Sequence, residues 1–184
     1  MIQFASQPKD LSAILQLVGQ SLLGRRTLRE FEVFRKSRQV RIDTYPPEIL
    51  SQLSEVADPG HLVGASFTTD GEVGAIHYDP ESPIGIVAPF LFHEIIHSLD
   101  LTLWEAASMS VSRSRIREVV FLAECRAFHA QHLFQEELKK IYPSLRAFHL
   151  FNYPHIPFLN RALEAREIER LYSLGNQEVR QKIA

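Results

Sequence analysis

Three residues near the middle of the chain have the types and the spacing that metal chemistry requires. His93, Glu94 and His97 form the pattern H-E-x-x-H, here HEIIH. On a helix that turns about 100° per residue, the two histidines lie about 40° apart and one turn apart, so both imidazoles can reach one metal ion. Glu94 is rotated about 100° from His93, beside such an ion but not bound to it. A carboxylate in that place can take a proton from a water that the metal has made acidic.

The residues around the motif favour this interpretation over a chance match. With eight His and 16 Glu in 184 residues, roughly 0.03 occurrences of H-E-x-x-H are expected by composition alone. The other faces of the predicted helix carry apolar residues, namely Leu91, Phe92, Ile95, Ile96 and Leu99. Such a helix is expected to be buried, and buried His and Glu side chains are costly unless they bind a metal or hydrogen-bond partners. The alternative is a core helix whose polar residues are satisfied by hydrogen bonds.

A third metal ligand is expected from another segment, because zinc sites that perform hydrolysis commonly use three protein ligands. The single cysteine, Cys125, excludes a cysteine-rich zinc site and leaves histidine and carboxylate as ligands. Glu124 lies at the edge of the apolar stripe of a long helix predicted for 115–141, where a carboxylate needs a cation. We therefore favour Glu124, whose alternative role is a salt bridge to an arginine. The competing donors are Asp100, His129 and His132.

Two supporting roles have candidates of their own. Asp100 lies one turn after His97 and is predicted to orient a histidine ring from behind, although it could also bind the metal itself. A donor for a developing oxyanion is sought in the loop FNYPHIPF, where Tyr153 and His155 are the candidates, with Arg126 outside the loop as a third. Packing anchors are the alternative role for Tyr153 and His155.

Predicted strands and helices surround the motif. The run LVGASFTTDGEVGAIHYDP predicts a β-hairpin that turns at Asp70–Gly71, and Pro89 is placed for the first turn of the helix that carries HEIIH and continues to about Trp104. Upstream, helical spacing predicts a helix over 11–22 that ends at Gly24, and alternation predicts a strand over 40–44. Three further helices are predicted, over 27–36, over 47–56 and from about 159 onward.

The order of these elements predicts a single α+β domain over 1–184. Within it, residues 1–60 supply helices and a strand, 61–141 form the core that carries the metal site, and 142–184 add a loop and a helix. No internal repeat or flexible linker divides the chain.

From about Gly64 to Gln131 the chain resembles the zincin metallopeptidases, in particular the glutamate-ligand branch, the gluzincins. The resemblance is carried by HEIIH, by the preceding strand GAIHYDP and by Glu124 on the next long helix. It implies a zincin-like fold, in which a small mixed sheet with a hairpin and an edge strand packs against the HEIIH helix and the long glutamate-bearing helix. It further implies a zinc metalloendopeptidase that binds Zn²⁺ through His93, His97 and Glu124, with Glu94 as general base and proton shuttle.

The resemblance also bears on the substrate. In the family the strand before the motif helix is the sheet edge along which a peptide lies extended, so residues 74–78 are expected to bind a protein or peptide substrate. The larger gluzincins often have an aspartate one turn after the glutamate, where this chain has Phe128. A zincin-derived regulatory or binding protein that retains zinc without turnover is the alternative function.

Charge and hydropathy give little reason to expect other partners. The formal net charge is −2, although the stretch from Arg25 to Arg41 contains seven basic residues and only two glutamates. That stretch could contact nucleic acid or an acidic partner, but a solvated helix face is expected in an otherwise balanced protein. The sequence shows no signal peptide and no membrane-spanning run, which favours a cytoplasmic protein, although an injected effector could also lack such signals. No pattern predicts an oligomeric state.

Overall fold

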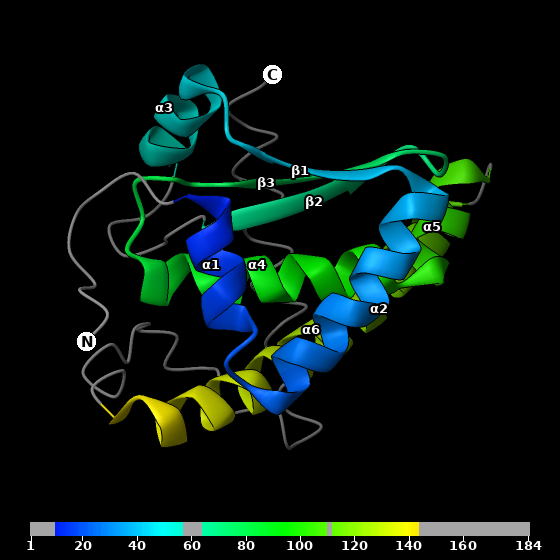
Figure 1. Ribbon diagram of the computed structural model, residues 1–184. Coiled ribbons are helices and arrows are strands. Elements are labelled where there is room, and N and C mark those ends of the chain that lie inside the picture. The colour runs from blue at the N-terminus through cyan, green and yellow to red at the C-terminus, as the bar shows by residue number, and fades with distance from the viewer. Residues whose placement is uncertain (1–9, 57–63, 110–111, 144–184) are drawn as a thin grey trace.

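The computed structural model describes residues 10–56, 64–109 and 112–143. This part of the chain is α+β, as predicted, and combines helices with a small mixed sheet (Figure 1). Its elements in chain order are α1 (Leu11–Val18), α2 (Leu22–Arg38), β1 (Val40–Thr44), α3 (Pro47–Val56), β2 (Ala65–Thr69), β3 (Gly74–Tyr78), α4 (Ile84–Leu99), α5 (Leu101–Ser108) and α6 (Arg113–Ile141).

The sheet has the strand order β1-β3-β2, with β1 parallel and β2 antiparallel to β3. Ile76 of β3 lies in register with Ile42 on one side and with Phe67 on the other. The hairpin between β2 and β3 turns at Asp70–Gly71, which confirms the prediction. Gly71 adopts a φ of 98°, a conformation that side chains disfavour and glycine accepts.

The expected substrate strand, Gly74–Tyr78, is the central strand and not an edge. β3 pairs with β1 on one side and with β2 on the other, so its backbone has no free edge for a peptide. The hairpin pattern could not show this, because β1 pairs in parallel with residues 34 positions further along the chain. The edge strands of the described sheet are β1 and β2, and of these two it is β2 that packs against the HEIIH helix.

The pairing of β2 with β3 determines which backbone N–H and C=O groups of β2 point toward β3 and which point away from it. The Asp79 amide donates to the Gly64 carbonyl at 3.0 Å, which makes this pair a hydrogen-bonded one. Hydrogen-bonded and non-hydrogen-bonded pairs alternate along the strand. The N–H and C=O groups of Ala65, Phe67 and Thr69 therefore point away from β3, toward the outer side of β2.

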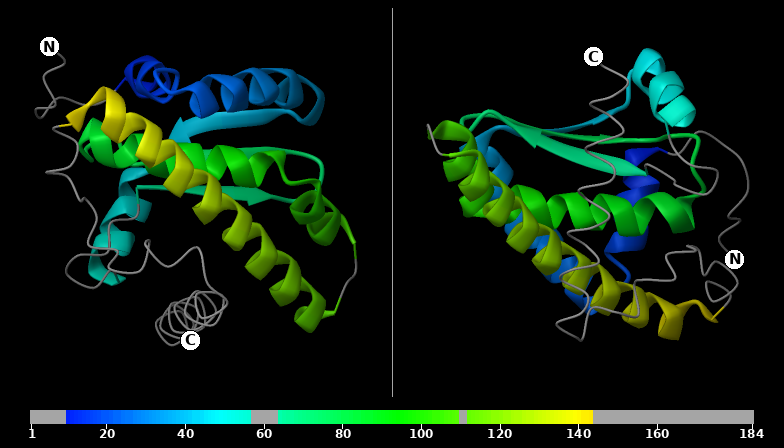
Figure 2. Two further views of the ribbon diagram at one scale, coloured as in Figure 1. Left: turned by 90° about the horizontal axis from the view of Figure 1, so that it is seen from below. Right: turned by 180° about the vertical axis from the view of Figure 1, so that it is seen from behind.

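Helix α4 is the centre of the molecule and packs against one face of the sheet (Figure 1). It contacts β2 and β3 above it and α1, α2 and α6 below and beside it. Leu91, Phe92 and Ile95 are fully buried, and the Phe92 ring stacks on Phe134 of α6 at 4.4 Å. Helix α6 crosses α4 obliquely, as both views of Figure 2 show. The HEIIH motif therefore lies between the sheet and the long helix.

Helix boundaries near the amino terminus differ from the prediction. The first helix ends at Val18, with Gly19 as its C-cap, and α2 begins at Leu22. Ser21 starts this new helix, because its hydroxyl accepts a hydrogen bond from the Gly24 amide at 2.7 Å. Gly24 is thus inside α2 and not a helix stop.

The HEIIH helix also begins and ends elsewhere than predicted. It begins at Ile84, so Pro89 lies inside the helix and one intrahelical hydrogen bond is missing there. It ends at Leu99, because Asp100 leaves the helical conformation and caps α5 instead. Trp104 anchors α5: its indole N–H donates to the Ser98 carbonyl at 2.8 Å, and its ring packs near Phe34 and Phe67.

No single helix in the described ranges combines the length and the apolar composition that crossing a membrane would need. Helices α4 and α5 taken together satisfy the length and composition test, but their axes are bent by 62°.

Candidate metal centre

The structure brings the three predicted ligands together. His93 and His97 come from α4 and Glu124 comes from α6, and their potential ligand atoms all lie within 4.8 Å of one another. The Nε2 atoms of His93 and His97 are each 3.2 Å from an oxygen of Glu124. The two Nε2 atoms are 2.9 Å apart. His129 and His132, the competing histidines, are not part of this cluster.

The spacing and the chemistry of these atoms fit a divalent metal ion. In a tetrahedral zinc site with ligand bonds of about 2.0–2.1 Å, the ligand atoms are about 3.3 Å apart. The separations of 3.2, 3.2 and 2.9 Å are close to that value. Two imidazoles and one carboxylate, with no thiolate, make the type of donor set that leaves a position open for water or substrate.

A glutamine sets the orientation of the first histidine. The Nδ1 atom of His93 lies 2.9 Å from Oε1 of Gln131, which is 2% exposed. An amide oxygen only accepts hydrogen bonds, so this contact is satisfied when Nδ1 carries the proton. A neutral His93 then has its Nε2 lone pair directed at the cluster.

Sequence reasoning missed Gln131, although a signal was present. Gln131 follows Glu124 by seven residues, two helical turns, so both side chains leave α6 from almost the same face. A polar residue on the line of a buried glutamate is a candidate partner for the same site.

Burial and mutual attraction shift the pKa values of the cluster. Burial favours the neutral form of Glu124, but the hydrogen bonds and charges of His93 and His97 outweigh it and hold the pKa of Glu124 well below its usual range. For His93, burial favours the neutral form, but Glu124, Glu94 and Gln131 together raise its pKa. Both shifts have one cause: a buried carboxylate that stays charged requires a nearby cation.

Glu94 is buried beside the cluster without belonging to it. Burial raises the pKa of Glu94, the charges of His93 and His97 oppose that rise, and the Phe67 backbone lowers the pKa slightly. This effect comes from a hydrogen bond between the Phe67 backbone and the Glu94 carboxylate. Because the Phe67 backbone groups point away from β3, Glu94 lies close to the outer side of β2. The sequence predicts a proton-accepting carboxylate at this place, beside the metal ligands.

Asp100 has partners other than the predicted histidine ring. Its carboxylate accepts hydrogen bonds from the Thr102 backbone at 3.1 Å, from the Thr102 hydroxyl at 2.6 Å and from Nε of Arg126 at 2.9 Å. The prediction assumed that the helix continues through Asp100. Because the helix ends one residue earlier, the side chain turns toward α5 and α6. Arg126, a candidate for the oxyanion site, is bound in this ion pair.

Other predicted or neighbouring residues complete the picture. Tyr153 and His155 lie outside the described residues, as does the predicted carboxyl-terminal helix. Phe128, one turn after Glu124, places its half-buried ring edge-on against the His93 ring at 4.5 Å and 67°.

In the basic stretch of α2 and β1, basic side chains form ion pairs with nearby glutamates of α2: Arg26 pairs with Glu30, and Arg35 pairs with Glu32.

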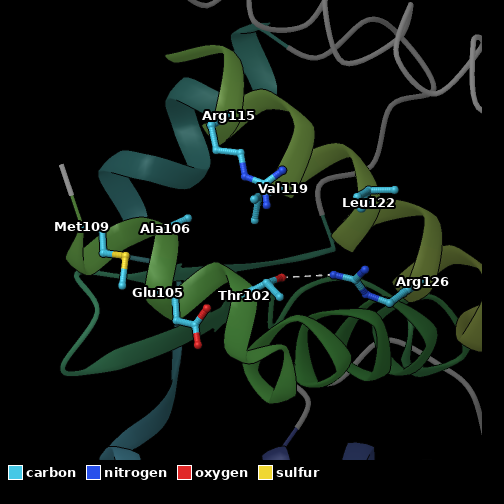
Figure 3. Close-up of a pocket in the computed structure, with 8 residues that line it drawn as sticks. All are labelled: Thr102, Glu105, Ala106, Met109, Arg115, Val119, Leu122 and Arg126. Atoms are coloured by element: carbon cyan, nitrogen blue, oxygen red, sulfur yellow. Dashed lines mark hydrogen bonds between the residues drawn. The ribbon is translucent and has the colours of Figure 1, made fainter. Parts of the chain in front are cut away.

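A separate pocket of about 220 Å³ lies between α5 and α6 (Figure 3). Arg126 and Leu122, two of its lining residues, are each two positions from Glu124, about 200° around the helix. The pocket is therefore on the far side of α6 from the metal cluster.

None of the family models, curated proteins or solved structures compared with the chain matches it. Its function is therefore inferred from the chemistry of the site itself.

Proposed function

We propose that this chain is a zinc-dependent metallopeptidase with a zincin-like fold, which hydrolyses peptide bonds in a protein or peptide. The observation that carries the proposal is the meeting of His93, His97 and Glu124 from two helices, with Glu94 buried beside them as a carboxylate outside the ligand set. A cluster that only stabilised the fold would not need this additional buried carboxylate.

The donor set assigns roles to the chain's own residues. His93, His97 and Glu124 would hold Zn²⁺, which when bound supplies a Lewis acid for the scissile carbonyl and lowers the pKa of water toward about 7. Glu94 accepts one proton as the water oxygen bonds to the carbonyl carbon. It then delivers that proton to the amine nitrogen as the C–N bond breaks. The reaction consumes one water and leaves Glu94 unchanged.

The outer side of β2 supports a peptide substrate. The N–H and C=O groups of Ala65 and Thr69 and the C=O group of Phe67 point outward, which is the arrangement that allows an extended peptide to add as a further strand. The Phe67 N–H donates to Glu94. Because Glu94 lies near the Phe67 backbone, a peptide bound there would run past the proposed general base. The proposed substrate strand is therefore Ala65–Thr69 and not residues 74–78.

Substitution of Glu94 tests the proposal. Glu94→Gln keeps the size of the side chain but cannot accept the proton, so we expect cleavage of an unfolded test protein to fall by at least about 10²-fold. Zinc content should stay near that of the wild type, because Glu94 is not a ligand. Glu72→Gln, an exposed change in the hairpin turn, is the matched control and should cleave normally.

Two results would contradict the proposal. Wild-type rates in Glu94→Gln would remove the proposed mechanism. A wild-type chain that binds zinc but shows no chelator-sensitive cleavage would instead favour the regulatory or binding protein.

A further inference from the structure

Gln131 is a buried polar side chain that links the two helices of the site. It is 2% exposed, it belongs to α6, and its amide oxygen reaches across to Nδ1 of His93 on α4 at 2.9 Å. Because its surroundings exclude water, no solvent molecule can readily replace it as the partner of His93. Loss of this acceptor would leave a buried N–H unpaired, which is unfavourable.

The contact determines which nitrogen of His93 is available to a metal. With the proton on Nε2 instead, the lone pair of Nδ1 would face the lone pairs of the Gln131 oxygen, and the nitrogen that faces Glu124 would be blocked. With the proton on Nδ1, both groups are satisfied. With its amide oxygen toward Nδ1, Gln131 thus favours the form of His93 that can bind a metal.

The charge balance of the site explains why an amide suits this position. Metal-bound histidines often donate their second N–H to a carboxylate. Here Glu94 and Glu124 are both buried at the cluster, and together they match the two positive charges of a divalent ion. A third carboxylate behind His93 would leave excess negative charge in a buried place, which is costly. Glutamine supplies the same acceptor oxygen without the charge.

Phe128 supports this arrangement from the side. Its ring lies edge-on against the His93 ring with centroids 4.5 Å apart, in the turn of α6 between Glu124 and Gln131. The imidazole is therefore restrained by an aromatic ring on one side and by a hydrogen bond behind it. A small or charged residue at position 128 would provide no such packing.

We propose that Gln131 is a positioning residue, which holds His93 in its metal-binding tautomer and thereby sets the metal affinity of the site. The inference rests on the proposed zinc site and concerns affinity, not turnover. Loss of a hydrogen-bond partner behind a metal-bound histidine typically costs 10–100-fold in metal affinity. The same loss is expected here.

The test measures zinc binding by competition with a chromophoric chelator, on the full chain. Gln131→Met keeps the length but removes the acceptor oxygen, and we expect the Kd for zinc to rise about 10–100-fold. Gln131→Glu keeps an acceptor oxygen at the same distance and should bind zinc at least about tenfold more tightly than Gln131→Met. Gln135→Met, one turn further along α6, is the matched control and should bind like wild type.

A second readout separates positioning from simple packing. In the zinc-loaded chain, NMR should show the Nδ1–H proton of His93 protected from exchange in the wild type and in Gln131→Glu, but not in Gln131→Met. An unchanged Kd in Gln131→Met, or a protected Nδ1–H proton in that variant, would overturn the inference. If Gln131→Met does not fold, Gln131→Asn replaces it, because its shorter side chain withdraws the oxygen from His93.

The outcome is distinguishable from failure of the proposed function. A wild-type chain that binds zinc tightly without cleaving peptides leaves the role of Gln131 intact. A wild-type chain that binds no zinc removes both.

Discussion

The two histidines of the cluster are restrained differently on the sides that face away from Glu124. Nδ1 of His93 is bound by Gln131, whereas Nδ1 of His97 is buried and has no hydrogen-bond partner within the described ranges. An unpaired buried polar atom costs about 1–3 kcal/mol. Among the described residues, the restraint behind His93 therefore has no counterpart behind His97.

Asp100 gives a prediction that depends on charge and not on shape. Burial raises the pKa of Asp100, but Thr102 and Arg126 together lower it below its usual value. A lowered pKa means that the charged carboxylate stabilises the fold above the unfolded-state pKa, and that this contribution is lost as the pH falls through the folded-state pKa. Asp100→Asn keeps the capping oxygen and removes the charge.

We expect Asp100→Asn to reduce the free energy of unfolding by about 0.5–1 kcal/mol at pH 7, a small value because Arg126 is about half exposed. At about pH 3, below the ordinary pKa of aspartate, the difference from the wild type should be smaller, because the lowered folded-state pKa makes this contribution fade as the pH falls. Urea unfolding at both pH values measures this, and an equal loss at both would show that the charge plays no part.

Sequence reasoning worked best for this site where the relevant geometry is local. The spacing of His93 and His97 on one helix determines that both rings can converge, and a buried glutamate in an apolar stripe needs a cation. The roles of Asp100 and Gln131 depended on where α4 ends and how α6 crosses it, which no local pattern contains.

At the level of elements, the junction of α1 and α2 is defined by a close backbone approach. A Cβ placed on Gly24 would lie 1.9 Å from the Val18 carbonyl oxygen, and a backbone atom cannot easily move away. At Gly19 the nearest atom would be 3.4 Å away, an ordinary contact, and the backbone is already helical there. The two glycines therefore have opposite tolerance for a side chain.

We expect Gly24→Ala to lower the free energy of unfolding by about 2 kcal/mol, within the range for overpacked sites. Gly19→Ala should be neutral or slightly stabilising, because alanine reduces the freedom of the unfolded chain. Denaturant unfolding of both variants checks this. Equal stabilities would mean that α1 and α2 do not approach as closely as described.

The same junction shows why some predicted boundaries were wrong. Helical spacing of apolar residues continues through residues 11–22, so periodicity alone does not reveal the break, which Ser21 makes by capping the next helix. Likewise the apolar run before HEIIH is entirely helical, and Pro89 lies inside α4 although it lacks the N–H that would bond to the carbonyl one turn earlier.

For the whole molecule, the parts of the fold that depend on distant residues were the least accessible from sequence. The α+β class, the hairpin and the long helix were predicted correctly, because each follows from local periodicity. The strand order β1-β3-β2 was not predicted. It places β3 in the centre of the sheet and leaves β2 with an open side. Single-domain organisation over 1–184 stays a prediction, and so does the zincin-like fold.

The metal site depends on this whole arrangement, since its ligands come from two helices that meet only in the folded chain. The most direct test is the metal content of the purified protein, measured by mass spectrometry on three chains. We expect about one zinc per chain in the wild type and in His129→Ala, an exposed histidine on α6, and nearly none in His93→Ala. A wild-type chain without zinc, or a His93→Ala variant that retains it, would contradict the account.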